Sequence, residues 1–394
     1  MAIMESTLTG VSFALTDEQK ELRALAREFA EKEIRPKAAE YDEAQTHPAD
    51  VIAKAHELGL MNVHVPQEYG GLGLSTFDGI LIGEELSWGC SGMAVSLTAN
   101  TLGAGPVFLA GTDEQKREWL VPLLEQPILC SFGLTEPDAG SDVARIKTSA
   151  ERRGDEYVLN GSKTFISNAG HAAWTVVFAK TDPNAGHRGL SAFVVPMDAP
   201  GVSVEKHLDK MGQRSTDTSA FALTDVVVPA ANRLGEEGDG FKIAMQTLDF
   251  TRPGTATGAV GVAQAAYDYA VEYARERVTF DVPIAMHQGV NFLIADMATE
   301  IEAARLLTWQ AAWMLDNGYG RKATLYSSFA KRFSADTAMK VTTDAVQVFG
   351  GYGYIKEYPV EKLMRDAKLF QIYEGTSQIQ RLVIAREIFM PSGD

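Results

Sequence analysis

The sequence is poor in cysteine and has no surplus of positive charge. Its 394 residues include two cysteines, Cys90 and Cys130, too few and too far apart for a disulfide framework or a thiolate metal site. Such sparse cysteine fits a reducing compartment. Lys and Arg number 36 against 52 Asp and Glu, which gives a net charge of −16. This charge argues against nonspecific binding to nucleic acid or to anionic membranes.

Segments that would direct the chain to a membrane are also missing. No run of about 18 uninterrupted apolar residues occurs, so we expect no membrane span. The first arginine is Arg23, and no basic stretch precedes an apolar run near the N-terminus. We therefore expect neither a secretion signal nor a transit peptide, and place the protein in the cytoplasm.

Common catalytic fingerprints are absent as well. There is no Gly-x-Gly-x-x-Gly and no Gly-Lys of a phosphate-binding loop. His56-Glu57 lacks the second histidine of a zinc-protease helix, and the other histidines show no ligand spacing, so we expect no catalytic metal. Ser328-Phe329-Ala330-Lys331 matches Ser-x-x-Lys, but its partner motifs are missing, which favours chance.

The sequence contains three regions of different periodicity. At roughly 100 to 200 residues per domain, its length predicts two or three domains. Residues 1–126 are expected to be helical, because capping boxes at Thr16 and Thr112 precede amphipathic segments. Residues 127–238 carry short β-rich runs, and residues 239–394 return to long helical periods. We expect an α+β protein with an antiparallel barrel-like or sandwich domain between two helical domains, the second a bundle.

The strongest turn signal in the middle region is Asn160-Gly161. It separates two short apolar runs, 157–159 and 164–166, and Asn-Gly suits the positive φ angles of a type I′ turn. The sequence therefore predicts a β-hairpin here. Further β-rich runs occur at residues 174–178, 190–195, 202–204 and 221–228.

Polar, glycine-rich loops lie where the regions join. Leu134–Asp142 follows the first expected strand with small and hydroxyl residues, which let a ligand approach backbone amides, although a domain linker has the same composition. Gly350–Gly353 follows a predicted helix and suits a C-cap. Tyr373–Thr376 suits a tight turn before the last helix, with Glu374 by default a solvated charge. Taken singly, each loop is more simply a connection than a binding site.

Taken together, the loops resemble the acyl-CoA dehydrogenase family, and most closely its medium-chain branch. The resemblance covers nearly the whole chain and implies a helical domain, a β-barrel-like domain and a C-terminal four-helix bundle. The motifs that carry it, in order, are Leu134–Asp142, Met211–Arg214, Thr251–Pro253, Asp344–Gln347, Pro359–Ala367 and Gln371–Gln380.

The resemblance implies FAD bound without a glycine fingerprint. It implies that the isoalloxazine ring is lined by Phe132, Leu134, Thr135, Phe165, Ile166 and Ser167, with the Ser167 hydroxyl at flavin N5 and Ser141 nearby. It implies that a neighbouring subunit holds the adenine end through Arg277, Thr279, Phe280, Gln288, Gln347 and Gly351, with Thr376 and Gln378 completing the site. A homo-oligomer follows, usually a tetramer built as a dimer of dimers.

Glu374 matches the catalytic base of the family. A saturated thioester is only weakly acidic at its α-carbon, so proton removal needs a positioned carboxylate and donors for the enolate oxygen. The family's donors are a ribityl hydroxyl and the backbone N–H of the base. The resemblance further implies that Ser141, Asp249, Arg252 and Gly375 hold or order the substrate. Other branches carry the base at the position of Thr251, which has no carboxylate here, so Glu374 is the candidate.

The implied reaction is FAD-dependent oxidation of a saturated, short- to medium-chain acyl-CoA to trans-2-enoyl-CoA, a step of fatty acid β-oxidation, with an electron-transfer flavoprotein as acceptor. The segment Met93–Thr101, expected near the acyl tail, is rich in small and hydroxyl residues. Asp138 and Asp281 replace glycines of the family, and we expect their side chains to point away from the cofactor.

Two alternatives use the same scaffold and base, an enoyl-CoA reductase and an acyl-CoA oxidase. A noncatalytic flavoprotein associated with DNA is a third hypothesis. The net charge of −16 and the presence of Glu374 argue against it.

Overall fold

Capping boxes begin helices of the N-terminal part, as predicted. Thr16 Oγ1 accepts the backbone N–H of Gln19 at 3.2 Å, and the Gln19 side chain accepts the Thr16 N–H at 3.1 Å. Thr112 forms the same box. The computed structural model describes residues 13–390. Its N-terminal helices are α1 (Asp17–Phe29), α2 (Ala38–Ala44), α3 (Ala49–Glu57), α4 (Thr76–Ala110) and α5 (Asp113–Glu125).

Helix α4 forms the core of the N-terminal part. Its backbone leaves helical geometry at Cys90 (φ −168°, ψ 116°), which bends the helix there, and it packs along α6 (Gly240–Glu276). By length and composition α4 could cross a membrane, with a mean hydropathy of 1.3, but 56% of that window is buried inside the fold. Its apolar surface is thus explained by packing as a core helix.

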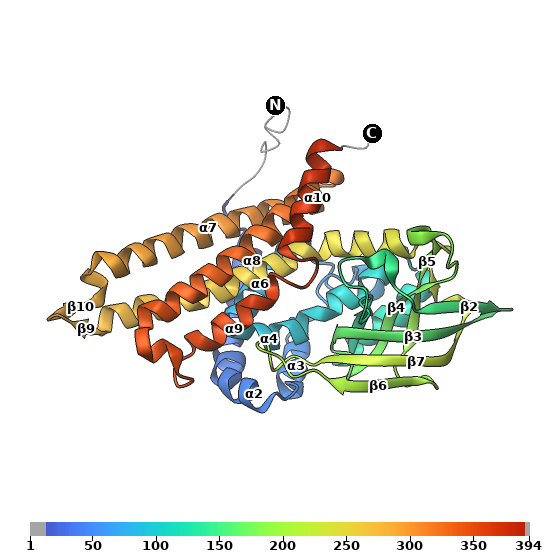
Figure 1. Cartoon of the computed structure of the whole chain (residues 1–394), viewed down its shortest axis with the longest axis horizontal. Helices are drawn as coiled ribbons and strands as arrows, with labels where there is room; N and C mark the ends of the chain where they lie inside the picture. The colour runs from blue at the N-terminus through green and yellow to red at the C-terminus, as the bar shows by residue number, and fades with distance from the viewer. Residues whose placement is uncertain (1–12, 391–394) are drawn as a thin grey trace.

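The middle region folds into one mixed sheet, seen at the right of Figure 1. The strands run in the order β6-β7-β3-β2-β4-β5-β8, and β1 pairs with β4 in parallel while most other pairings are antiparallel. The strands are β1 (Leu129–Gly133), β2 (Ser149–Arg153), β3 (Glu156–Ser167), β4 (Ala172–Lys180), β5 (Leu190–Pro196), β6 (Val202–His207), β7 (Thr218–Pro229) and β8 (Arg233–Leu234).

The hairpin predicted at Asn160-Gly161 is wrong. Strand β3 runs straight through this dipeptide, and the tight turn lies earlier, between Arg153 and Glu156. Gly161 instead marks a β-bulge opposite β7, where a Cβ atom would come within 2.4 Å of Thr148 Oγ1. The glycine is therefore needed for close approach of two strands rather than for a reversal of the chain.

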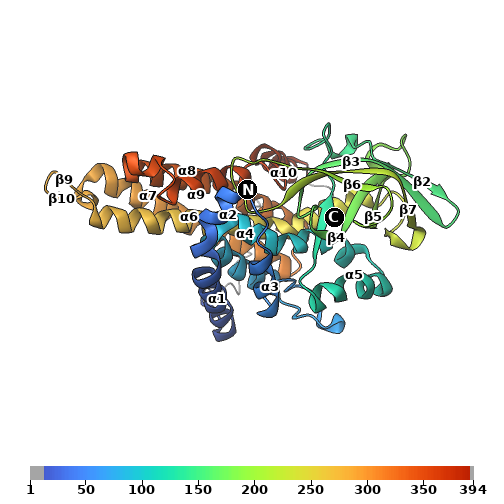
Figure 2. The same cartoon turned by 90° about the horizontal axis from the view of Figure 1, so that it is seen from below.

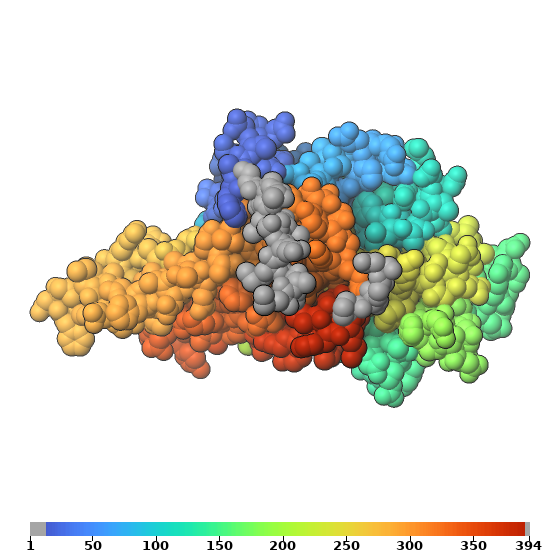
Figure 3. All heavy atoms as spheres, turned by 90° about the horizontal axis from the view of Figure 1, so that it is seen from above, coloured from blue at the N-terminus to red at the C-terminus, as the bar shows by residue number. Residues whose placement is uncertain are grey.

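The C-terminal part is a bundle of long helices that extends away from the sheet (Figure 1; Figure 2). Helices α6, α7 and α8 pack along one another, and a short hairpin of β9 and β10 closes their far end. That end projects beyond the rest of the molecule in Figure 3. The remaining elements are β9 (Val278–Thr279), β10 (Val282–Pro283), α7 (Gln288–Asp316), α8 (Arg321–Phe349), α9 (Val360–Phe370) and α10 (Ser377–Phe389).

Candidate active site

Glu374 lies in the turn between α9 and α10, on strained backbone. Glu374 has φ +51° and Gly375 has φ +87°, so two successive residues adopt left-handed geometry that is costly for glutamate. The side-chain amide of Gln380 donates to the carbonyls of both residues at 3.1 Å. The first turns of α10 therefore hold the unusual backbone in place.

The Glu374 carboxylate faces α6. Thr251 Oγ1 donates to Glu374 Oε2 at 3.0 Å. Burial raises the pKa of Glu374 above its ordinary value of 4.5, while the Thr255 and Thr251 hydroxyls and the nearby cations Lys331 and Arg252 act in the opposite direction. The carboxylate is thus held in one orientation and binds a proton more tightly than an exposed glutamate does.

Two further predicted substrate residues lie beside it on α6. The Arg252 side chain is 4% exposed and pairs with Asp249, whose other oxygen accepts the Thr324 hydroxyl at 2.9 Å. Burial raises the pKa of Asp249. Arg252 Nε has no partner among the described residues, although it is buried. A buried donor without a partner is suited to a polar group of a ligand.

On the sheet side, a buried ion pair fixes the loop after β1. Lys163 Nζ donates to the Leu134 carbonyl at 3.2 Å and to Glu136 Oε1 at 2.8 Å. The Lys163 side chain is fully buried, which lowers its pKa to about 8, whereas the ammonium and neighbouring donors lower the pKa of Glu136 despite partial burial. This pair was not predicted from the sequence, because its two members lie in different segments.

The predicted ring-lining residues come together next to this pair. The Thr164 N–H donates to the Thr135 carbonyl at 3.0 Å, which joins the loop after β1 to β3. A break in the β3–β7 register places Phe165 at φ +59° with 67% of its side chain exposed. Leu134 and Ile166 are buried, and Phe132, Thr135 and Ser167 are partly buried.

This surface suits a flat aromatic cofactor. An exposed phenylalanine on strained backbone gains by stacking on a ring, and Phe132 and the peptide groups around Thr135 line the same loop. Gln213, which precedes β7 of the same sheet, joins the sheet side to the bundle, because its N–H donates to Asp366 Oδ1 at 2.5 Å and its side chain reaches the Tyr373 hydroxyl at 3.4 Å. The residues present therefore fit a flavin ring between the sheet and the bundle.

The Asp138 side chain is exposed and has a cation of its own as partner. Its carboxylate accepts from Lys147 Nζ at 2.7 Å, and that ammonium lowers the pKa of Asp138. Ser141 is exposed on the same loop. Asp281 has φ +65°, the left-handed geometry that favours the glycine it replaces.

The predicted adenine contacts mostly lie elsewhere. Arg277, Thr279 and Phe280 are at the β9–β10 end of the bundle, where the Arg277 guanidinium lies 5.5 Å from the Tyr352 ring, next to Gly351. Phe280 is 90% exposed at φ +52°. At 1.5 Å per residue along α6, this end is roughly 40 Å from Thr251, farther than one dinucleotide extends.

The other predicted adenine contacts divide between these two places. Gln288 begins α7 and Gln347 lies near the end of α8, both at the far end of the bundle, whereas Thr376 caps α10 beside Glu374 and Gln378 is exposed on that helix. The predicted cofactor contacts of one chain thus form two separate groups.

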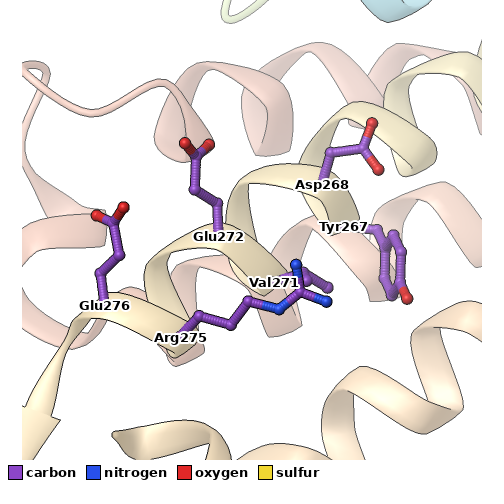
Figure 4. Close-up of a pocket in the computed structure, with 6 residues that line it drawn as sticks. All are labelled: Tyr267, Asp268, Val271, Glu272, Arg275 and Glu276. Carbon is purple, nitrogen blue, oxygen red and sulfur yellow. The ribbon is translucent and has the colours of Figure 1, made fainter.

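A surface groove along the bundle is a different feature. It has a volume of about 460 Å³ and follows α6, lined by Tyr267, Asp268, Val271, Glu272, Arg275 and Glu276 (Figure 4). None of the predicted site residues lines it. Its acidic lining does not suit an anionic cofactor.

Comparison with known proteins identifies the family. The acyl-CoA dehydrogenase N-terminal, middle and C-terminal domain models match residues 16–126, 131–226 and 238–389. The short-chain specific acyl-CoA dehydrogenase of Clostridium acetobutylicum is 44% identical over 380 residues, which cover 96% of this chain and 100% of that protein.

Solved structures with a similar fold point to the same family. Butyryl-CoA dehydrogenase from Megasphaera elsdenii matches with a TM-score of 0.93 and 44% identity, covering 96% of this chain and 100% of that one. A chain in the structure of the electron transferring flavoprotein of Acidaminococcus fermentans matches with a TM-score of 0.94 and 45% identity, at the same coverage.

The chain therefore belongs to the acyl-CoA dehydrogenase family. Its α+β fold is the fold of that family, its cofactor is FAD, and its reaction class is FAD-dependent dehydrogenation of acyl-CoA, as the sequence predicted. The roles of individual residues stay predictions.

Proposed function

We propose that Glu374 removes the α-proton of a saturated acyl-CoA. The observation that supports this most strongly is the Glu374 carboxylate itself, partly buried, oriented by Thr251 at 3.0 Å and raised in pKa by burial. A carboxylate with a raised pKa is a better base while remaining ionised near neutral pH.

The neighbouring groups of the chain have distinct tasks. The Glu374 N–H, which belongs to the left-handed turn, donates to the thioester oxygen and stabilises its developing charge. Arg252, with its unpartnered Nε, and Asp249 order the substrate from α6. Phe165 and Ser167 hold the ring that faces the β-carbon. When bound, FAD supplies the acceptor for the hydride.

The substrate that the relatives favour has a short to medium acyl chain. The relatives described above include an enzyme named short-chain specific and a butyryl-CoA dehydrogenase. In this chain the segment 93–101 of α4 presents small and hydroxyl residues, among them Ala94 and Thr98. We propose butyryl-CoA as the first substrate to test and an electron-transfer flavoprotein as the acceptor, in a cytoplasmic protein.

We further propose that the protein is a homo-oligomer, a tetramer built as a dimer of dimers. The roughly 40 Å between the two groups of cofactor residues supports this, because the group at the β9–β10 end then serves the FAD of a neighbouring subunit.

The test is the Glu374→Gln variant of the FAD-loaded enzyme. We expect kcat with butyryl-CoA to fall about 1,000-fold, because glutamine cannot accept the proton, while FAD content and substrate affinity stay near wild type. Full activity in this variant would remove Glu374 from the mechanism. Comparing oxygen with electron-transfer flavoprotein as acceptor separates a dehydrogenase from an oxidase, and assaying enoyl-CoA reduction tests the reverse direction.

A further inference from the structure

Lys331 is a buried cation that the proposed mechanism leaves unused. Its side chain is fully buried in α8, and Nζ donates to the carbonyls of Phe370 and Gly375, each at 2.7 Å. Phe370 is the last residue of α9 and Gly375 follows Glu374 directly. One ammonium group therefore connects the two ends of the turn that carries the base.

Lys331 belongs to the match to Ser-x-x-Lys that the missing partner motifs marked as a chance occurrence. Lys331 is the lysine of Ser328-Phe329-Ala330-Lys331. Ser328 Oγ is buried and has no partner within residues 13–390, so the structure gives no serine nucleophile activated by this lysine. The lysine has a different, specific set of partners in the turn.

Burial of this ammonium is costly, and its surroundings only partly offset the cost. The two acceptors of Nζ are carbonyls, and no ion pair joins Lys331 to a carboxylate within residues 13–390. Burial lowers the pKa of Lys331 to about 8, although Glu374 and Asp336 act in the opposite direction. The carbonyl end of α9 is the negative pole of a helix, which favours a cation. An apolar side chain would avoid the cost of desolvation, so stability alone does not account for a lysine here.

The charged groups around the turn come from three helices, α8, α6 and α10. Lys331 and Asp336 face it from α8, and Arg252 faces it from α6. Asp336 is itself occupied, since it accepts the Gln371 amide at 2.8 Å and the Arg381 guanidinium at 2.9 Å. Two nearby cations, Lys331 and Arg252, thus favour the ionised form of Glu374.

We propose that Lys331 is a positioning residue for Glu374, which fixes the left-handed turn through the Phe370 and Gly375 carbonyls and helps to keep the carboxylate ionised. The proposal rests on the proposed role of Glu374. Because Lys331 acts through the turn, its removal is expected to change the rate and the pH dependence more than the binding of substrate.

The test compares Lys331→Met with wild type in the FAD-loaded enzyme. We expect kcat to fall about 10- to 100-fold with KM within about threefold, since a displaced base slows proton removal. In the pH profile of kcat/KM, which reports the free enzyme, the midpoint of the acid limb should move to a pH about half a unit higher. Hydrogen–deuterium exchange of residues 371–376 should become faster.

Two variants serve as controls. Thr342→Val removes a buried hydroxyl of the same helix that bonds only to helical carbonyls, and it should change none of these quantities. Lys331→Gln keeps a hydrogen-bond donor but removes the charge. It therefore tests the shift of the acid limb of kcat/KM if Lys331→Met does not fold.

The outcomes separate the two proposals. Normal kcat and an unmoved acid limb in Lys331→Met or Lys331→Gln would overturn the role of Lys331, as would a loss that only follows FAD content or thermal stability. If Glu374→Gln is inactive in the same assays, the role of Glu374 survives that result. If Glu374→Gln is active, the proposed function fails first.

Discussion

Glu374 and Thr251 lie 123 positions apart in the sequence, but Thr251 Oγ1 and Glu374 Oε2 lie 3.0 Å apart in the structure. The resemblance identified Glu374 from the motif around it, and Thr251 only as a position without a carboxylate. That its hydroxyl orients the base could not be predicted, because the contact depends on how α6 packs against the turn after α9. At the residue scale, local motifs thus predict Glu374 as the candidate base, and tertiary packing supplies the partners of its carboxylate.

The first residue-scale prediction concerns Thr251→Val. Losing a hydrogen bond to the ionised carboxylate should raise the pKa of Glu374 further, so the acid limb of kcat/KM moves up by about one pH unit. We also expect kcat to fall about 10-fold, because the carboxylate loses its orientation. A pH profile of the purified holoenzyme measures both.

The matched control is Thr257→Val, which removes a buried hydroxyl of the same helix that donates to the Ile80 carbonyl at 2.9 Å. Its acid limb should coincide with that of wild type. An unmoved limb in Thr251→Val would mean that this hydroxyl does not act on the base.

A second prediction follows from the direction of the Glu374 pKa shift. Since burial raises this pKa, the folded protein binds a proton there at pH values where the unfolded chain has released it. Glu374 therefore contributes less and less to the free energy of unfolding as the pH rises above 4.5, the ordinary pKa of a glutamate. We expect Glu374→Gln to be more heat-resistant than wild type at pH 8, with the difference shrinking towards pH 4 in thermal melts. A difference that grows towards pH 4 would contradict the raised pKa.

At the scale of elements, strand β3 brings both sheet-side features to the site. Lys163 anchors the loop after β1 from its inner face, and the bulge two residues later presents Phe165 outward. The β-rich runs 157–159 and 164–166 predicted extended chain here but divided it into two strands, and the capping boxes predicted the starts of α1 and α5. The hairpin prediction failed because Asn-Gly marks positive or otherwise unusual φ, which a bulge can use as well as a turn.

The element-scale prediction is that Lys163→Met loosens this loop. Removing one member of a buried ion pair leaves Glu136 uncompensated, so the free energy of unfolding should fall by about 3 kcal/mol and FAD should dissociate more readily. Denaturant titration and the ratio of flavin to protein absorbance measure the two effects.

Lys147→Met is the control, since its pair with Asp138 is exposed and screened by solvent, so its loss should change the free energy of unfolding far less than Lys163→Met does. Equal losses in both variants would show that the buried pair has no special part in holding the loop.

At the scale of the whole molecule, the two groups of cofactor residues lie at separate ends of the bundle, and this separation is the structural argument for assembly. Composition and periodicity predicted three regions but gave no distance between segments. The roughly 40 Å between Thr251 and the β9–β10 hairpin follows only from the unbroken helix α6.

The prediction at this scale is for Phe280→Ala. Because the side chain is 90% exposed, its loss should leave the fold of the subunit unchanged, whereas FAD content or the oligomeric state should fall if the hairpin serves a neighbouring subunit. Sedimentation velocity and flavin absorbance give the readout. Phe13→Ala, at an aromatic side chain 67% exposed in the N-terminal part, should affect neither. A monomeric wild-type protein that retains FAD would refute the shared site.

The central claim is that Glu374 removes the α-proton of a saturated acyl-CoA. Its most direct test is the rate at which the flavin band bleaches when holoenzyme and butyryl-CoA are mixed without oxygen. We predict rapid bleaching in wild type, several-fold slower bleaching with α-deuterated substrate, and binding without bleaching in Glu374→Gln. Bleaching of Glu374→Gln at the wild-type rate, or of wild type with no isotope effect from the α-carbon under chemistry-limited conditions, would contradict the account.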